Sequence, residues 1–420
     1  GIIVSTDAHS KLQYGVVFYN EETKTAQHQD VSARDIPSLN VDITYSTLSS
    51  IAHLLPEPTT HRGAMGRPDA SLWKAAELKE CDNIFLEKKC LRTIELVNIP
   101  KSAIIMPMRW VYKIKTNADG SIERYKARLV AKGFKQIPGV HFDEKHTFSP
   151  SASSLIFRFL MTIIVNFSLF AFSMDVTAAF LNSKPKFDNY VQLPDGFLYR
   201  GSSYAFMLQN IYGTRDAARG WYDDQHDFLI ASYPLLVRSA VDPCLYYMFD
   251  KNLIVFIVVT VDDYAVATSS EQWYKSFFAT YSKRFPCRDL GPLELYNGIH
   301  IHMNATRTTV RLTQQREITA LLERFGMLDC NPARTPMPTD FQAPPRSTSD
   351  AVPDFAYPSL IGALLWIARM TRPDILYAVI FLSAFMKTFT SIHVTAAKRI
   401  LRYLKATITY SFTFTASEQF

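Results

Sequence analysis

The stretch FIVVTVDDYAVAT, from Phe256 to Thr268, places two adjacent aspartates, Asp262 and Asp263, inside a run of apolar residues. β-branched and aromatic residues dominate positions 253–261, and apolar residues return at 264–267, which predicts two strands joined at the aspartates. Carboxylates in an apolar setting are costly unless a cation or hydrogen-bond donors compensate them. The pair therefore either lies exposed on a hairpin turn or binds a metal ion.

A third carboxylate lies in a similar setting. In FAFSMDVTAAFL the apolar residues at positions 170, 172, 174 and 176 share one strand face, and Asp175 lies on the other. Three carboxylates held on strands suit two Mg²⁺ ions, because Mg²⁺ prefers hard oxygen ligands and keeps positions open for water and phosphate. Spacing alone leaves a second interpretation open, in which Asp175 caps a turn or pairs with a basic residue.

The apolar segment SLIFRFLMTIIVNFSLFAF, from Ser154 to Phe172, resembles a membrane span in length. Arg158 and Asn166 interrupt it, and it runs directly into SMDV. We therefore predict a buried helix followed by a core strand, and the membrane span is the less favoured alternative.

The positive charge of the chain is concentrated in one segment. Residues 101–146 hold ten Lys and Arg against four Asp and Glu, which equals the net charge of +6 of the whole chain. Two alternating runs flank Asn117–Gly120 and predict a hairpin. Its alternation gathers six cations on one face, where they would repel one another unless an anion lies over them, so we favour a phosphate-binding surface over a solvated face. These cations are Arg109, Lys113, Lys115, Arg124, Lys126 and Arg128.

The composition is that of a globular chain. At 420 residues, with 48% hydrophobic and 20% charged residues, it is expected to form two or three domains. The five cysteines form no CxxC or Cys/His pattern, which argues against a zinc site or a disulfide framework and favours a reducing intracellular compartment. The chain begins at Gly1 without a signal peptide, which we interpret as a piece of a longer polypeptide.

Three further segments have a recognisable character. Residues 1–70 are polar with little periodicity and are expected to be a linker or polyprotein-derived segment, with order beginning near Ser71 as the cap of a helix. Residues 335–354 are rich in Pro and Ser and are expected to be a linker. In AAKRILRYLKAT the cations Lys398, Arg402 and Lys405 line one helical face, for which a solvated face is slightly favoured over a nucleic-acid contact.

From about Ser71 to Thr407 the chain resembles the reverse transcriptase of copia-type (pseudovirus) LTR retrotransposons. The matching blocks, in order, are RWVYKIKTNADGSIERYKARLVAKGFKQIPGVHFDEKHTFSP, MDVTAAFLN, LPDGF, IYG with RGWY, VDDY, DLGPLELYNGIHI, TRPDILYAV and KRILRYLKAT. The resemblance implies an α+β right-hand polymerase with fingers, a palm of antiparallel strands backed by helices, a thumb and part of a connection region. It implies fingers and palm over 71–270, primer grip and thumb over 271–335, and linker and connection over 336–420, with the RNase H domain absent.

The resemblance also implies roles for single residues. Asp175, Asp262 and Asp263 would be the catalytic and metal-binding triad, with the Val176 carbonyl as a further ligand. Phe180 would stack under the incoming sugar and exclude a 2′-hydroxyl, although ordinary core packing is its alternative role. DLGPLELYNGIHI, which contains Gly298, would be the primer-gripping hairpin. The triphosphate candidates are Lys113, Lys126 and Arg128, and the remaining nucleic-acid candidates are Arg109, Lys115, Arg124, Lys398 and Arg402.

The implied function is RNA-directed DNA polymerisation in retrotransposition. One Mg²⁺ would lower the pKa of the primer 3′-hydroxyl and a second would stabilise the pyrophosphate leaving group, with Mn²⁺ as an alternative ion. The implied partners are an RNA template, a nucleic-acid primer, the RNA/DNA hybrid, dNTPs, and the RNase H and integrase of the same polyprotein. No membrane is implied, and a homo-oligomer is left open. We expect an intracellular, cytoplasmic location, including virus-like particles.

This chain departs from the family pattern at several positions. The family usually has Tyr-Val-Asp-Asp where this chain has Thr260 in the first position, and Leu-Tyr-Gly-Leu-Lys-Gln where it continues with Thr214, Arg215 and Asp216. Asn297 replaces a usual Leu. These departures leave open an alternative function, a catalytically decayed retrotransposon remnant that only binds nucleic acid. A metal-dependent nuclease would share the triad but would not need Phe180 or the ordered blocks.

Overall fold

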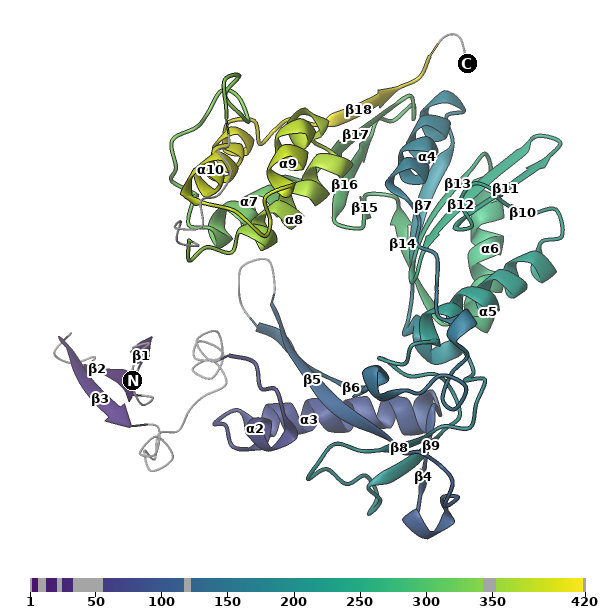
Figure 1. Ribbon diagram of the computed structural model, residues 1–420. Coiled ribbons are helices and arrows are strands. Elements are labelled where there is room, and N and C mark those ends of the chain that lie inside the picture. Colours follow the sequence, from purple (N-terminus) through teal and green to yellow (C-terminus); the bar gives the residue numbers. More distant parts are fainter. Residues whose placement is uncertain are drawn as a thin grey trace. The chain divides into compact units, whose positions relative to one another are not determined.

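The structure is a computed structural model that describes residues 2–6, 13–20, 25–32, 56–116, 122–342 and 353–417 (Figure 1). The chain divides into two compact units, one of residues 1–149 and 180–224, and one of residues 150–179 and 225–420. Each unit combines helices with sheets in which most neighbouring strands run antiparallel. The predicted α+β class is therefore confirmed.

Regular structure begins well before Ser71, contrary to the expectation of a linker without order. A three-stranded antiparallel sheet lies within the first 32 residues, because segments such as QYGVVFYN are rich in β-branched and aromatic residues. The α3 helix begins at Ala70, so Ser71 lies inside it and does not cap it. The Asp69 carboxylate before the helix instead accepts hydrogen bonds from Arg67 and from the Trp73 indole. The elements are β1 (Ile2–Thr6), β2 (Gln13–Asn20), β3 (Thr25–Ser32), α2 (His61–Met65) and α3 (Ala70–Cys81).

The predicted basic hairpin is present as β5 (Met106–Thr116) and β6 (Ile122–Ala131), although its turn lies outside the described residues. The hairpin forms one end of a five-stranded sheet with the order β4-β9-β8-β5-β6. Its apolar face is buried, and the Trp73 ring of α3 packs edge-on against Tyr112 at 5.1 Å between centroids. The apolar back therefore anchors the hairpin and leaves the other face to the cations. The other strands are β4 (Leu91–Ile94), β8 (Tyr190–Gln192) and β9 (Tyr204–Met207).

The second unit is built on a six-stranded antiparallel sheet with the order β10-β11-β12-β13-β7-β14. The helices α4 (Ser154–Asn166) and α6 (Glu271–Arg284) lie on opposite sides of it (Figure 1). The prediction of a buried helix and core strand between Ser154 and Phe172 is confirmed. Among the described residues, no helix is long and apolar enough to cross a membrane. The strands are β10 (Val237–Arg238), β11 (Leu245–Asp250), β12 (Leu253–Thr260), β13 (Asp263–Thr268), β7 (Phe170–Val176) and β14 (Cys287–Pro292).

A smaller four-stranded sheet, in the order β15-β16-β17-β18, shares a hydrophobic core with α4 and one face of the large sheet. Its last strand comes from the C-terminal region of the chain and pairs with β17. The bounds are β15 (Leu295–Tyr296), β16 (Ile299–Met303), β17 (Thr309–Thr313) and β18 (Phe412–Thr415).

A single hydrophobic core joins the last four α-helices of the described chain. The expected boundary at residues 335/336 falls inside this core, because α7 packs with helices that follow the Pro-rich segment. Residues 343–352 of that segment lie outside the described residues. The helices are α7 (Gln315–Arg324), α8 (Tyr357–Met370), α9 (Leu376–Ser383) and α10 (Ser391–Ala406), with η7 (Pro373–Ile375) leading into α9 as TRPDILYAV predicts.

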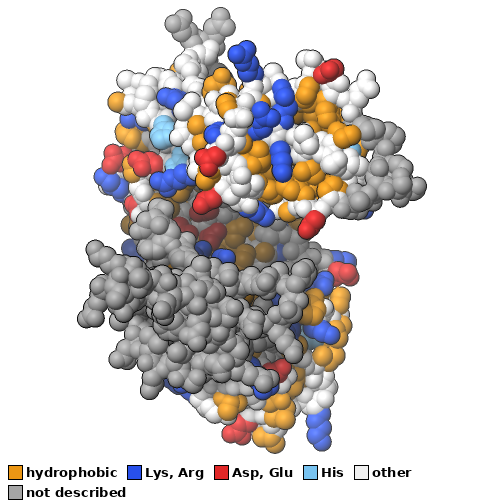
Figure 2. All heavy atoms as spheres, turned by 90° about the vertical axis from the view of Figure 1, so that its left-hand side faces the viewer, with side chains coloured by type: hydrophobic (Ala, Val, Ile, Leu, Met, Phe, Trp, Pro, Cys, Tyr) orange, Lys and Arg blue, Asp and Glu red, His pale blue; other side chains and the backbone are white. Residues whose placement is uncertain are grey.

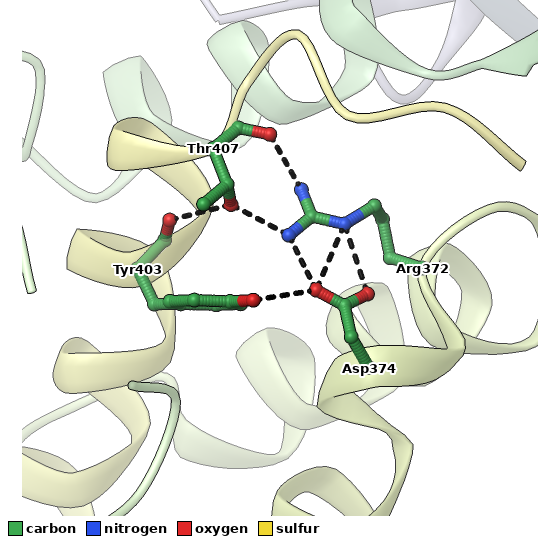
Figure 3. A network of polar contacts seen from close by, with 4 residues as sticks. All are labelled: Arg372, Asp374, Tyr403 and Thr407. Atoms are coloured by element: carbon green, nitrogen blue, oxygen red, sulfur yellow. Dashed lines mark hydrogen bonds and ion pairs between the residues drawn. The ribbon is translucent and has the colours of Figure 1, made fainter. Parts of the chain in front are cut away.

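The buried Arg372 connects the start of η7 to the end of α10 (Figure 3). Its guanidinium donates to both carboxylate oxygens of Asp374, and to the carbonyl and the hydroxyl of Thr407 at 3.0 and 2.6 Å. The Tyr403 hydroxyl donates to Asp374 at 2.9 Å. The Thr407 carbonyl, at the C-terminus of α10, therefore accepts from Arg372 as well as from the Tyr410 N–H, and the network ties η7 to the end of this helix.

Candidate active site

The three predicted aspartates come together at one end of the large sheet. Thr260 pairs with Asp263 across the β12–β13 hairpin, so Val261 and Asp262 form its two-residue turn. Asp263 is also directly opposite Asp175 on β7. Residues directly opposite in an antiparallel pair share one face, with their Cβ atoms about 5 Å apart. The predicted hairpin with the aspartates at its tip is therefore confirmed.

This arrangement concentrates negative charge. Asp263 is half-buried, and burial together with the charges of Asp262 and Asp175 raises the pKa of its carboxyl to about 6. The two neighbouring carboxylates create a negative potential at Asp263, and such a potential favours a bound cation.

A cation from the chain itself already contacts this cluster. Arg288 on β14 is opposite Asp175, and its guanidinium reaches the Asp175 carboxylate at 2.7 Å. Arg288, Asp175 and Asp263 therefore form one row across three adjacent strands. The alternative in which Asp175 pairs with a basic residue is thus what the structure shows. Within the described ranges, no three Asp, Glu, His or Cys side chains converge as a metal site.

The donor set still fits hard divalent cations in its chemistry. All three side chains offer carboxylate oxygens, the ligands that Mg²⁺ and Mn²⁺ prefer. Burial is the largest cause of the raised pKa of Asp263, and the charges of Asp262 and Asp175 add to it. Because the Arg288 side chain is largely exposed, its ion pair contributes little and can be exchanged for another cation.

The other residues assigned near the triad take varied positions. The Val176 N–H donates to the Asp262 carbonyl at 2.8 Å, which ties the turn to β7. Phe180 lies half-exposed on η6 (Ala179–Asn182), and along the chain it is the residue at which the first unit resumes. Gly298 lies in the β15–β16 turn with φ of +75°, a conformation that favours glycine.

Thr260, which stands where the family usually has tyrosine, has a specific partner. Its hydroxyl shares a hydrogen bond of 2.6 Å with the Tyr296 hydroxyl on β15. Sequence reasoning did not identify Tyr296 or Arg288. The Arg288 contact depends on the pairing of β14 with β7, and the Tyr296 contact depends on how β15 packs beside the end of β12. The block containing DLGPLELYNGIHI marked the region but not these contacts.

The predicted face of six cations is confirmed by the hairpin register. Lys113 is opposite Lys126, Lys115 is opposite Arg124, and Arg128 is opposite Val111. Arg109 pairs with Val130 and belongs to the same face by alternation. Five of the six side chains are exposed, and Lys126 is half-buried.

Mutual repulsion on this face is visible at Lys126. Burial lowers the pKa of its ammonium, and the charges of Arg128 and Arg124 lower it further. The face also has more acidic neighbours than the sequence suggested, since Glu57 pairs with Lys113 at 3.0 Å and Glu80 of α3 interacts with Lys126. These partial compensations leave an excess of positive charge on the hairpin.

The cations of α10 mostly contact the chain itself. Arg402 donates to the Asn331 carbonyl at 2.6 Å, and Lys405 donates to the Cys330 carbonyl at 2.8 Å. The Lys398 ammonium lies over the Phe355 ring. On the surface in the upper part of Figure 2, Lys and Arg side chains lie among hydrophobic ones. Arg402 and Lys405 of α10 therefore hold the segment that follows α7, and Lys398 and Arg402 have fewer donors left for nucleic acid.

Comparison with known proteins identifies the family that this chain resembles. A family model described as reverse transcriptase (RNA-dependent DNA polymerase) matches residues 91–339. The chain is 30% identical over 390 residues to the retrovirus-related Pol polyprotein from transposon TNT 1-94 of Nicotiana tabacum, covering 91% of this chain and 29% of the relative. It is 35% identical over 318 residues to the Pol polyprotein from transposon RE1 of Arabidopsis thaliana, covering 75% and 21%. The chain thus spans less than a third of these relatives.

Among solved structures, a foamy viral protease–reverse transcriptase in complex with double-stranded DNA is similar to this chain with a TM-score of 0.42 and 13% identity. The similarity covers 96% of this chain and 71% of that one.

Proposed function

The chain belongs to the reverse transcriptase (RNA-dependent DNA polymerase) family, and from this premise we propose that it extends a primer on an RNA template by adding deoxynucleotides. The resemblance to copia-type retrotransposon reverse transcriptases is confirmed by the family model and by the plant transposon relatives. Family membership also supports the expected right-hand polymerase fold.

The observation that carries the proposal is the row of Asp175 and Asp263 on paired strands with Asp262 in the adjoining turn. Sheet hydrogen bonding fixes the backbone of Asp175 and Asp263, and the bond from the Val176 N–H to the Asp262 carbonyl fixes the backbone of Asp262. Rigid strands hold side chains more accurately than loops do, which nucleotidyl transfer needs because catalysis depends on positioning and charge stabilisation.

We propose that these three carboxylates bind two Mg²⁺, with Mn²⁺ as an alternative, and that the Val176 carbonyl contributes a further oxygen. When bound, such ions activate the primer hydroxyl and neutralise the charge of the leaving pyrophosphate. Arg288 then has to leave Asp175, which its exposed position allows.

The basic hairpin is proposed as the fingers. Its six cations would lie along phosphates of the template or the incoming nucleotide, with Lys113, Lys126 and Arg128 as triphosphate candidates. By the same family reasoning, the large sheet is proposed as the palm, β15–β16 as the primer grip, and the four helices of the C-terminal core as the thumb and connection. Phe180 is proposed as the residue that excludes a 2′-hydroxyl.

Because the relatives are Pol polyproteins, we further propose that RNase H and integrase act beside this chain on the same polyprotein. The substrates would then be primed RNA, the RNA/DNA hybrid and dNTPs, inside the cell. A homo-oligomer stays open.

The test is primer extension by the purified chain with an RNA template, a DNA primer, Mg²⁺ and dNTPs. Asp263→Asn removes one carboxylate charge and should lower nucleotide addition at least about a hundredfold, while primer–template binding persists. The matched control is Asp250→Asn. Asp250 is exposed and lies opposite Leu253, at the end of β12 far from the aspartate turn, so this variant should extend the primer at the wild-type rate.

Two outcomes would contradict the proposal. Equal losses in both variants would show that the effect is one of folding. A wild-type chain that binds primer–template but adds no nucleotide, with Mg²⁺ or Mn²⁺, would instead identify the binding-only remnant that the family departures leave open.

A further inference from the structure

The turn that carries Asp262 has a strained backbone. It consists of Val261 and Asp262 between the paired Thr260 and Asp263. Val261 has φ of +57°, a region in which the Cβ of an L-residue crowds the backbone and which β-branched residues rarely adopt. Such a conformation persists only when its surroundings hold it, and it is often found where function requires it.

Two contacts hold this turn from different sides. The Val176 N–H donates to the Asp262 carbonyl at 2.8 Å from β7. The Thr260 hydroxyl shares a hydrogen bond of 2.6 Å with the Tyr296 hydroxyl from β15. The first contact fixes the middle of the turn, and the second fixes its entry.

Tyr296 is itself firmly held. It is buried, and its ring stacks on Phe157 of α4 with centroids 5.1 Å apart and planes 7° apart. Burial raises the pKa of Tyr296 above its usual range, so its hydroxyl stays protonated and able to donate. A ring fixed in the core between α4 and the large sheet makes a rigid support for Thr260.

We infer that Tyr296 is a positioning residue, which through the Thr260 hydroxyl holds the strained Val261–Asp262 turn and so keeps Asp262 and Asp263 in place for nucleotide addition. This inference rests on the proposed function. It also gives a role to the Thr260 departure, since a short hydroxyl side chain reaches Tyr296 where relatives carry an aromatic ring. Neither residue supplies one of the three carboxylates, so the effect assigned to them is on the placement of those carboxylates.

The test compares two buried tyrosines. Tyr296→Phe removes only the hydroxyl that bonds Thr260. The control is Tyr357→Phe, because Tyr357 is equally buried and its hydroxyl donates to the Leu382 carbonyl at 2.8 Å in the helical core. In single-turnover addition, Tyr296→Phe should lower the rate constant about fivefold or more, as expected for one lost buried hydrogen bond, with primer–template affinity unchanged. Tyr357→Phe should lower stability but leave the rate per folded molecule unchanged.

Substitutions at Thr260 show whether the effect passes through the shared hydrogen bond. Thr260→Val should lower the rate as Tyr296→Phe does, and the double variant should be no slower than either single variant. Thr260→Ser keeps the hydroxyl and should retain most of the rate. Effects that multiply in the double variant, or equal rate losses in Tyr296→Phe and Tyr357→Phe, would overturn the inference.

A readout independent of activity separates this inference from the proposed function. Hydrogen exchange at the Val176 amide reports the bond to the Asp262 carbonyl, and it should become about fivefold faster in Tyr296→Phe and unchanged in Tyr357→Phe. If the wild-type chain adds no nucleotide but shows this exchange pattern, the proposed polymerase function fails while the turn is still held by Tyr296. An unchanged Val176 exchange rate would overturn the inference whatever the activity.

Discussion

Replacing Arg372 by leucine should destabilise the C-terminal helical core by about 3 kcal/mol. The substitution removes the guanidinium that binds the Asp374 carboxylate and that donates to the carbonyl and the hydroxyl of Thr407 (Figure 3). Breaking a fully buried ion pair costs about 3–5 kcal/mol, but the Asp374 side chain is 34% exposed, which reduces that contribution. The Thr407 carbonyl keeps its hydrogen bond from the Tyr410 N–H, so the loss of the two hydrogen bonds from Arg372 to Thr407 adds about 1 kcal/mol. The total corresponds to roughly a 150-fold change in the ratio of folded to unfolded core.

The matched control is Tyr403→Phe, which removes one hydrogen bond to Asp374 and leaves the guanidinium in place. It should cost about 1 kcal/mol or less. Hydrogen exchange in urea, read at amides of α8 and α10, measures the free energy of opening this core separately from the other unit. Equal losses of unfolding free energy in the two variants, or a loss below about 1 kcal/mol in Arg372→Leu, would refute the assignment of Arg372 as the main contact between η7 and the end of α10.

The contribution of Asp374 also depends on pH. Burial alone would raise the pKa of this carboxyl, but hydrogen bonds from Arg372 and Tyr403 outweigh burial and lower it. A carboxyl whose pKa falls on folding stabilises the folded state above its unfolded pKa, and this stabilisation is lost as pH falls through the folded pKa. The difference between wild type and Arg372→Leu should therefore be constant near neutral pH and shrink below about pH 4. A difference that stays constant down to pH 2 would contradict this.

Three further perturbations follow from the described contacts. Gly213→Ala should lower the free energy of unfolding, measured by thermal unfolding, by more than about 2 kcal/mol, because the new Cβ would lie 2.3 Å from the Ala131 carbonyl oxygen. The control is Gly201→Ala, which is also at positive φ but has open space around it and should cost about 1 kcal/mol. Asp263→Asn should stabilise the metal-free protein by about 1 kcal/mol at pH 8 and not at about pH 3, because the raised pKa destabilises the folded state progressively between the unfolded pKa of about 4 and the folded pKa of about 6. An equal effect at both pH values in urea titrations would contradict the charge argument. Lys126→Gln should reduce the salt dependence of primer–template binding, measured by fluorescence anisotropy, by about one ion, while Lys405→Gln, whose ammonium is held by the Cys330 carbonyl, should not.

Local patterns predicted the parts of the fold that depend on alternation. The apolar run broken by Asp262 and Asp263 predicted the hairpin, and the six basic positions predicted one charged face, because strand residues two apart always share a side. The helix from Ser154 followed by a strand was predicted because Arg158 and Asn166 make a membrane span costly.

Contacts between distant segments could not be predicted in the same way. Arg288 faces Asp175 because β14 pairs with β7 in one register, and a shift of one residue would turn Arg288 to the other face. Glu57 reaches Lys113 from a segment that composition alone assigns to a linker. Ser71 was a reasonable cap, but Asp69 precedes the helix and uses its carboxylate for Arg67 and Trp73.

The ion pair between Arg288 and Asp175 bears on whether the sheet folds before or after a metal ion binds. Repulsion between Asp175 and Asp263 opposes the pairing of β7 with β13, and even the weak ion pair with Arg288 offsets part of it. With Arg288 on the neighbouring strand, the sheet can assemble before any ion from solution arrives. Under the proposed function, chelation of Mg²⁺ should stop nucleotide addition without unfolding the protein, and the metal ion can bind last, together with the nucleotide.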